Sequence, residues 1–184
     1  YITKPFNERE LLSRMRNTLR RIERNRAANP LTGLQGNLEI QRELESRIAK
    51  GKPYAVLYID LDNFKPFNDV YGFTRGDMAI KLTAEILCEQ VARQGRGDEF
   101  IGHIGGDDFM IVATPDVAEG ICRECIRVFD EKIRLLYKPS DVKQGFILSS
   151  NRKGAEETYP IVSISMGIAT NEHRAYGSAL EVSS

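Results

Sequence analysis

The chain has 184 residues, with 26 basic and 26 acidic side chains and therefore a formal net charge of zero. A balanced charge creates no overall attraction to nucleic acid or to an anionic membrane, so we expect neither as a partner and expect any phosphate ligand to be held locally. The three cysteines form no disulfide framework, and no apolar run approaches the roughly 18 residues that span a bilayer, which predicts a reduced, cytoplasmic protein.

The first 28 residues predict a segment that precedes the main domain. Residues 1–7 contain a Lys4-Pro5 step, and proline favours an extended conformation in the residue before it. Residues 8–28 carry apolar side chains that recur every three or four positions: Leu12, Met15, Leu19 and Ile22. This spacing predicts a linker helix with a narrow apolar seam, and such a seam favours pairing with a second copy over a solvated linker.

Residues 29–184 predict a mixed α/β domain. In chain order we expect a helix at 37–49 closed by Gly51, a buried strand at 54–59, a helix at 75–91, strands at 100–104 and 109–113, a helix at 115–137, and strands at 146–148 and 161–169. The two strands around the glycines form a hairpin, which interrupts any simple alternation of strands and helices. We therefore expect a central, largely antiparallel sheet flanked by helices and not a doubly wound parallel sheet.

Acidic residues follow the buried strand and occupy the hairpin turn. Asp60 and Asp62 end the strand, and Asp107 and Asp108 follow Gly105-Gly106. Each motif alone is typical of a solvated acidic turn, but carboxylates gathered at strand ends are what Mg²⁺ or Mn²⁺ requires from a protein that shares the ion with substrate phosphates. The glycines permit positive φ and leave no side chain between the backbone and a ligand. Together the two motifs predict metal-assisted chemistry on a phosphate compound.

The motifs from about Pro30 to Ala169 resemble the GGDEF family of diguanylate cyclases in order and spacing: Leu31-Thr-Gly-Leu34, Ile59-Asp-Leu-Asp-Asn-Phe-Lys65, Asn68-Asp69, Gly72, Gly76-Asp77 and Gly105-Gly-Asp-Asp-Phe109. The resemblance implies a palm-like nucleotide-cyclase fold and the condensation of two GTP molecules into cyclic di-GMP and two pyrophosphates. It also implies a homodimer, because each domain of the family holds one GTP. Tyr1 to Phe6 resembles the last strand of a receiver domain, which implies that residues 1–7 are its tail and that the chain is the output of a response regulator.

The resemblance further assigns the metal and catalytic residues. Asp60 and Asp107 would be the metal carboxylates, and the carbonyl of Leu61 would be an additional ligand for Mg²⁺ or Mn²⁺. Asp108 and Lys65 would complete the catalytic set. Lysine suits this position because its ammonium is a compact charge for a phosphate.

The same resemblance assigns the nucleotide contacts. Phe64 would offer its backbone N–H to the phosphates, and Gly105-Gly106 would let the backbone approach them. Asn68 and Asp77 would read guanine, since a carboxylate can accept from both N1–H and the exocyclic amine of that base. Taken without the resemblance, Asn68 is an ordinary turn former and Asp77 an ordinary charge near a helix N-terminus.

Several positions depart from the family pattern. Asp108 replaces the usual glutamate, His103 replaces an arginine, and Asn29 and Asn37 replace an aspartate and an arginine. We expect His103 to be structural, because a lone histidine within a strand is seldom catalytic. The family's last helix is absent by Ser184, which predicts that the C-terminal end of the domain is truncated.

Arg96 and Glu99 occupy the place of the family's product-inhibition motif, in which an aspartate is usual, so cyclic di-GMP is a candidate inhibitor as well as the product. Asp98 could substitute for that aspartate, and a solvated charged loop is the alternative. Three functions remain open from the sequence. They are an active cyclase, a degenerate domain that binds GTP or cyclic di-GMP without turnover, and a structural dimerisation module.

Overall fold

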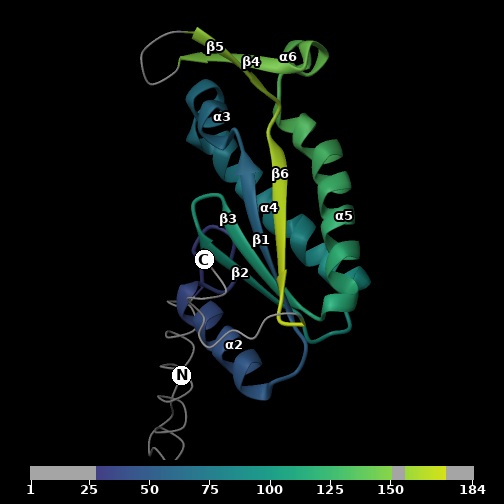
Figure 1. Ribbon diagram of the computed structural model, residues 1–184. Helices are drawn as coiled ribbons and strands as arrows, with labels where there is room; N and C mark the ends of the chain where they lie inside the picture. The colour runs from purple at the N-terminus through teal and green to yellow at the C-terminus, as the bar shows by residue number, and fades with distance from the viewer. Residues whose placement is uncertain (1–27, 151–155, 173–184) are drawn as a thin grey trace, which may run out of the picture.

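The computed structural model describes residues 28–150 and 156–172 (Figure 1). The predicted receiver tail at 1–7 lies outside the described residues, as does the linker helix at 8–28 except for Ala28. In the described part of the chain, no helix combines the length and the apolar character needed to cross a membrane.

A four-stranded sheet forms the centre of the domain, in the order β2-β3-β1-β6 with every neighbouring pair antiparallel. Its strands are β1 (Ala55–Asp62), β2 (Phe100–Gly105), β3 (Asp108–Ala113) and β6 (Ser163–Thr170). A separate two-stranded sheet contains β4 (Phe146–Ser150) and β5 (Glu156–Pro160). The predicted central antiparallel sheet and the predicted hairpin are confirmed.

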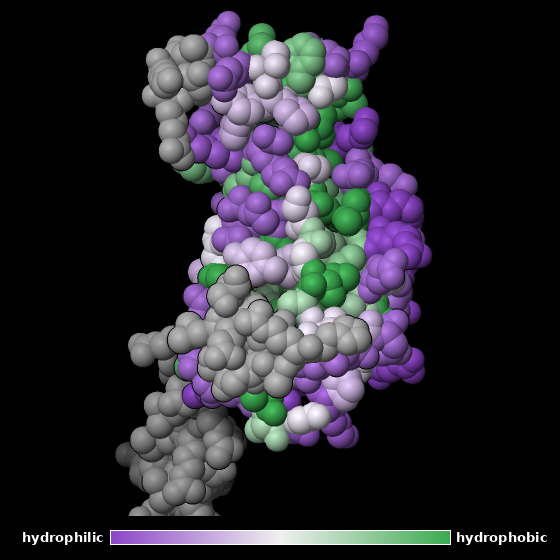
Figure 2. All heavy atoms as spheres, viewed as in Figure 1, coloured by the Kyte–Doolittle hydropathy of each residue, from purple (hydrophilic) through white to green (hydrophobic). Residues whose placement is uncertain are grey.

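Helices cover both faces of the central sheet (Figure 1). They are α2 (Asn37–Lys50), α3 (Phe64–Tyr71), α4 (Phe73–Gln94), α5 (Pro115–Lys132), the short 3₁₀ helix η1 (Ile133–Leu136) and α6 (Pro139–Gln144). The long helices α4 and α5 pack together over one face, and α2 packs on the other. The surface over α5 is largely hydrophilic (Figure 2), because its outward face carries ion pairs between neighbouring turns such as Arg127–Glu131.

The alternation of β1 distributes its side chains between two apolar clusters. Leu57, Ile59 and Leu61 point into the larger cluster under α4 and α5. Val56 points to the opposite face, into the smaller cluster beneath α2. On that second face β1 continues with Tyr58, Asp60 and Asp62, and the exposed fraction of Tyr58 is 41%. One half of this face is therefore apolar and covered, and the other half is polar and accessible.

Three elements were not expected from the sequence. The helix α3 spans only two turns and contains Pro66, so its apolar spacing of Phe64, Phe67 and Tyr71 is too short to predict a helix by periodicity alone. The elements α6 and β5 were also missed. The prediction of one helix over 115–137 is wrong at its end, because α5 stops at Lys132 and the chain continues as η1.

Candidate active site

Acidic residues from two strands meet where β1 and the β2–β3 hairpin end. The paired register of β1 with β3 ends at Ile59 opposite Phe109, so Asp60 and Asp108 come next on neighbouring strands. Asp107 lies in the turn immediately before β3, and its charge raises the pKa of Asp60. The fold thus brings Asp60 and Asp107, which are far apart in the sequence, to the same end of the sheet.

The electrostatics of this cluster are unfavourable without a cation. Burial raises the pKa of Asp60, and the charges of Asp107, Asp108 and Asp62 raise it further, while a hydrogen bond with the backbone of Leu61 lowers it. Burial also raises the pKa of Asp107, its own backbone N–H lowers it, and the charge of Asp108 raises it. Neither Asp60 nor Asp107 forms an ion pair with a described residue. Negative charge is therefore concentrated here, and no basic side chain in the described part of the chain pairs with Asp60 or Asp107.

The cluster fits a divalent cation that arrives with a phosphate ligand. Within the described residues, no three His, Cys, Asp or Glu side chains are grouped so as to hold a metal ion by themselves. Mg²⁺, however, is usually held by one or two carboxylates together with substrate phosphates and water. Asp60 and Asp107 supply such a partial set, and a cation would relieve the repulsion that raises the pKa of both carboxyl groups.

The hairpin turn leaves its backbone open. Gly105 has φ 151° and Gly106 has φ 61°, both in the region that favours glycine. A Cβ built at either position would have no atom within 4 Å. The backbone of this turn is therefore unobstructed where a side chain would project, and its contact with a ligand stays a prediction.

The helix α3 begins directly after the acidic end of β1. Its first residues, Phe64 and Lys65, carry backbone N–H groups that lie at a helix N-terminus, a favourable position for phosphate. The side chain of Lys65 is exposed and forms no ion pair with a described residue. Asp62 is engaged differently from Asp60, since the hydroxyl groups of Ser163 and Ser165 donate to its Oδ2 at 2.9 and 2.7 Å.

Asn68 and Asp77 lie on either side of the α3–α4 junction. The Oδ1 atom of Asn68 is buried and accepts no hydrogen bond from a described residue. Asn68 packs against Gly76 in the first turn of α4, and Asp77, the next residue, is exposed. An unsatisfied buried acceptor costs free energy unless a ligand or water satisfies it, so the Asn68 amide is a second indication of a binding site.

His103 is buried, with an exposed fraction of 2%, and its ring stacks on Phe109 with centroids 4.3 Å apart. Its Nε2 lies 3.0 Å from the carbonyl oxygen of Gly106, to which it donates, and its Nδ1 lies 3.0 Å from Oγ1 of Thr32. The ring therefore joins the loop that enters the domain to the glycine turn. This arrangement agrees with the expected structural role of His103.

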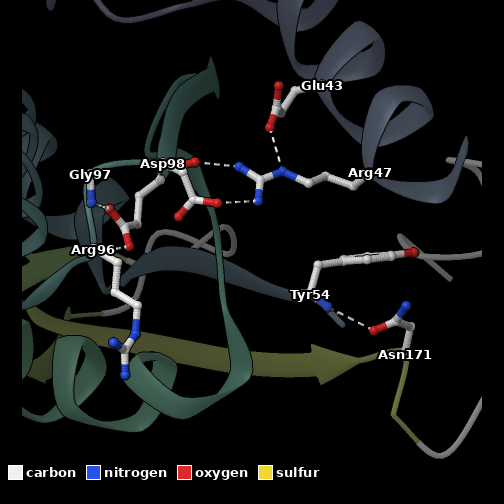
Figure 3. Close-up of polar contacts among 8 residues, drawn as sticks. Glu43, Arg47, Tyr54, Arg96, Gly97, Asp98 and Asn171 are labelled. Atoms are coloured by element: carbon white, nitrogen blue, oxygen red, sulfur yellow. Dashed lines mark hydrogen bonds and ion pairs between the residues drawn. The ribbon is translucent and has the colours of Figure 1, made fainter. Parts of the chain in front are cut away.

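The loop between α4 and β2 is held by three sets of contacts, of which Figure 3 shows the one between Arg47 and Asp98. Arg47 on α2 donates to Oδ2 of Asp98 at 3.1 Å and also to its backbone carbonyl. Glu99 accepts from the backbone N–H groups of Arg96 and Gly97 at 2.6 and 2.9 Å. The guanidinium of Arg96 instead pairs with Asp116 at the start of α5. The side chains of Arg96 and Glu99 thus have different hydrogen-bond partners, and their binding of cyclic di-GMP stays a prediction.

Sequence reasoning missed two residues beside the cluster. The hydroxyl of Tyr58 donates to Oδ1 of Asp108 at 2.8 Å, and Thr32 contacts His103. The position of Tyr58 two residues before Asp60 was a usable signal, because residues i and i+2 of a strand share a face. The contact of Thr32 had no such signal, since it depends on how the entry loop folds against β2.

Comparison with known proteins places this chain in a family. Residues 27–182 match the family described as "Diguanylate cyclase, GGDEF domain". The chain is 31% identical over 104 residues to the probable diguanylate cyclase DgcJ of Escherichia coli K12, which covers 53% of this chain and 20% of that protein. It is 34% identical over 74 residues to the diguanylate cyclase DosC of the same strain, and this match covers 40% of this chain and 15% of DosC. The chain therefore spans a fifth or less of the length of these relatives.

Solved structures show the same fold. The coiled coil and GGDEF domain of DgcB from Caulobacter crescentus, solved in complex with c-di-GMP, superposes with a TM-score of 0.62 at 20% identity, covering 95% of this chain and 83% of that one. The FimX GGDEF domain of Pseudomonas aeruginosa superposes with a TM-score of 0.59 at 16% identity, covering 85% and 86%. With the match over residues 27–182, these findings lead to one conclusion: the chain belongs to the GGDEF family of diguanylate cyclase domains.

Proposed function

We propose that this domain is an active diguanylate cyclase that joins two GTP molecules into cyclic di-GMP and releases two pyrophosphates. The observation that carries the proposal is the pair Asp60 and Asp107, which share one end of the sheet and have no basic partner among the described residues, with the charge of Asp107 contributing to the raised pKa of Asp60. The N-terminus of α3 follows Asp60 closely in the chain. Membership of the family supports the same reaction.

In this proposal each residue has a defined task. Asp60, Asp107 and the carbonyl of Leu61 hold Mg²⁺ or Mn²⁺. When bound, the ion supplies activation of a ribose hydroxyl and neutralises charge on the leaving pyrophosphate. The backbone N–H of Phe64 and the ammonium of Lys65 bind phosphate oxygens. Asp108 accepts the proton that the attacking hydroxyl releases, because it is the next carboxylate along the same strand end.

Base recognition is assigned to Asn68 and Asp77. The buried Oδ1 of Asn68 lacks a donor among the described residues, and guanine carries N–H groups that can supply one. The exposed carboxylate of Asp77 can accept two hydrogen bonds from the same edge of guanine. Adenine does not present this pair of donors, so Asn68 and Asp77 would be left without hydrogen-bond partners when ATP is bound. The site should therefore prefer GTP to ATP.

The reaction requires two copies of the domain. Each copy has one acidic cluster and one α3 N-terminus, which suits one GTP, and two phosphodiester bonds must form between two nucleotides. We propose a homodimer whose approach is controlled by the upstream segment, with residues 1–7 as the tail of a response-regulator receiver and 8–28 as the pairing helix. Cyclic di-GMP is further proposed to bind at Arg96 and Glu99 as an inhibitor. The protein is proposed to act in the cytoplasm.

The proposal is tested by incubating purified protein that carries this domain with GTP and Mg²⁺ and measuring cyclic di-GMP by mass spectrometry. Asp60→Asn and Asp107→Asn should each abolish product and weaken metal-dependent GTP binding. Glu85→Gln, an exposed acid on α4, is the matched control and should retain full activity. Absence of product while GTP still binds would overturn the cyclase proposal, and a preference for ATP would overturn the roles of Asn68 and Asp77.

A further inference from the structure

Tyr58 is an exposed aromatic residue on the central strand of the sheet. Its neighbours Leu57 and Ile59 are fully buried, whereas 41% of Tyr58 is exposed. It lies opposite Met110 on β3 and opposite Gly167 on β6. Because glycine has no side chain, β6 offers the phenol nothing to pack against at this level. The ring instead reaches along β3, where its hydroxyl donates to Oδ1 of Asp108 at 2.8 Å.

The Tyr58 hydroxyl differs from the other groups near the acidic cluster in that it donates a hydrogen bond to one of its carboxylates. Among the described residues, it is the one side-chain group that donates to Asp60, Asp107 or Asp108. Tyrosine has two side-chain torsions, and this one is anchored on a strand that is paired on both sides. A donor on an anchored side chain with few rotatable bonds restricts the rotation of the carboxylate that it contacts.

The chemistry of the donor also matters. A lysine or arginine in this position would neutralise Asp108 and compete with a metal ion for the cluster. A phenol orients the carboxylate and leaves its charge in place.

We propose that Tyr58 is a positioning residue, which fixes the Asp108 carboxylate through Oδ1 so that Oδ2 is presented to the reacting groups. The inference rests on the proposed cyclase activity, and it adds a residue that the sequence motifs do not contain. Tyr58 does not itself touch the nucleotide in this proposal. Its effect passes through Asp108.

The substitution Tyr58→Phe tests the proposal because it removes one oxygen atom from an exposed side chain and leaves the ring in place. We expect kcat for cyclic di-GMP formation to fall about tenfold, the scale of one hydrogen bond to a charged group, while KM for GTP changes less than about twofold. Mn²⁺ binding in the presence of GTP, followed by electron paramagnetic resonance, should stay at the parent level. Equal losses in kcat, KM and Mn²⁺ affinity would indicate general damage and overturn the positioning role.

Tyr159→Phe is the matched control. Tyr159 is also on a strand, and its hydroxyl donates to the carboxylate of Glu157 at 2.7 Å, away from the acidic cluster. This variant should retain the parent kcat. If it loses as much activity as Tyr58→Phe, the effect is not specific to Asp108 and the proposal is wrong.

A measurement without substrate separates this inference from the cyclase proposal. In metal-free protein, Tyr58→Phe and Asp108→Ala should shift the unfolding temperature non-additively, because each substitution removes one partner of the same hydrogen bond. Additive shifts would show that the two side chains are not coupled and would overturn the inference even if the parent protein makes product. If the shifts are non-additive but the parent protein makes no cyclic di-GMP, the contact between the two side chains exists but has no catalytic role. That result would overturn the cyclase proposal.

Discussion

The side-chain amide of Asn68 occupies the space directly beside the Cα of Gly76. A Cβ built on Gly76 would lie 2.9 Å from Cγ of Asn68 and closer still to Oδ1. Asn68 is near the end of α3 and Gly76 is in the first turns of α4, so the missing side chain allows the two helices to place the amide at their junction. The absence of a side chain at Gly76 is therefore a condition for the position of the proposed guanine contact.

We predict that Gly76→Ala displaces Asn68 and raises KM for GTP by about tenfold or more, the cost of losing one buried polar contact. The protein should still fold, because alanine favours a helix over glycine by about 1 kcal/mol. Gly120→Ala in α5 is the control, since its Cβ would meet only the tip of Gln94 at 2.8 Å. An unchanged KM for Gly76→Ala would contradict the placement of guanine beside Asn68.

We predict that Asp107→Asn stabilises the metal-free protein at neutral pH. The pKa of Asp107 is raised by folding from an ordinary value of 3.8, so the folded state binds a proton more tightly and stability falls as pH rises through this window. Asparagine does not ionise and therefore avoids this loss of stability. The unfolding temperature of the Asp107→Asn variant at pH 7 should exceed the parent's by about 1 to 4 °C.

The gain from Asp107→Asn should disappear below about pH 3.5, where the carboxyl group is protonated in both the folded and the unfolded state. Thermal melts between pH 3 and pH 8 in a chelator measure both effects, with Glu85→Gln as the control. Added Mg²⁺ with GTP should stabilise the parent but not the variant. A variant that is less stable than the parent at pH 7 would contradict the electrostatic strain inferred for this cluster.

We predict that Thr32→Val lowers both stability and turnover, although Thr32 lies in the loop that enters the domain. The substitution removes the hydroxyl that contacts Nδ1 of His103, whose other nitrogen holds the carbonyl of Gly106. Loss of one partly buried hydrogen bond should reduce the free energy of unfolding by about 1 to 2 kcal/mol, measured by urea denaturation. Thr32→Ser retains the hydroxyl and should restore most of the loss. If serine behaves like valine, packing of the methyl group and not the hydrogen bond is responsible.

We predict that Arg47 and Arg96 differ in what they stabilise. The Arg47 side chain is only 13% exposed and bridges Glu43 and Asp98, so Arg47→Ala should reduce stability by about 1 to 3 kcal/mol and increase amide hydrogen exchange in residues 95–99. The exposed pair of Arg96 with Asp116 should contribute little to stability, because solvent screens the attraction between the two charges.

Arg96→Ala therefore also tests product inhibition. It should relieve inhibition by cyclic di-GMP, with little change in the unfolding temperature, if Arg96 and Glu99 bind the product. Glu119→Ala, another exposed residue in a surface ion pair, is the control. The same inhibition constant in Arg96→Ala and the parent would remove this site from the proposal.

Local patterns in the sequence predicted the elements whose signals lie within one segment. The helix closed by Gly51 is α2, and Gly51 has the left-handed conformation that ends a helix. The buried strand is β1, and the glycine-bearing turn joins β2 to β3. The signal is local in each case, because spacing and backbone preference act within a few residues.

The contacts that organise the candidate site could not be predicted in the same way. Thr32 and His103 are 71 residues apart, and Tyr58 and Asp108 are 50 apart, so no periodicity relates them. Their contacts depend on the register between strands and on how a loop packs against a sheet edge. The short helix α3 likewise depends on the apolar core into which Phe67 inserts, since two turns are not stable by themselves.

By itself, the sequence determined which residues are candidates for the chemistry, namely the carboxylates at two strand ends, the glycine turn and the polar residues after β1, because residue type and short-range spacing are properties of the chain. Only the tertiary structure decided how these groups act on one another. It placed Asp60 beside Asp107, left the Asn68 oxygen without a donor among the described residues and brought the Tyr58 hydroxyl to Asp108. These relations arise from the pairing of distant strands and the packing of helices, which set distances that no local pattern contains.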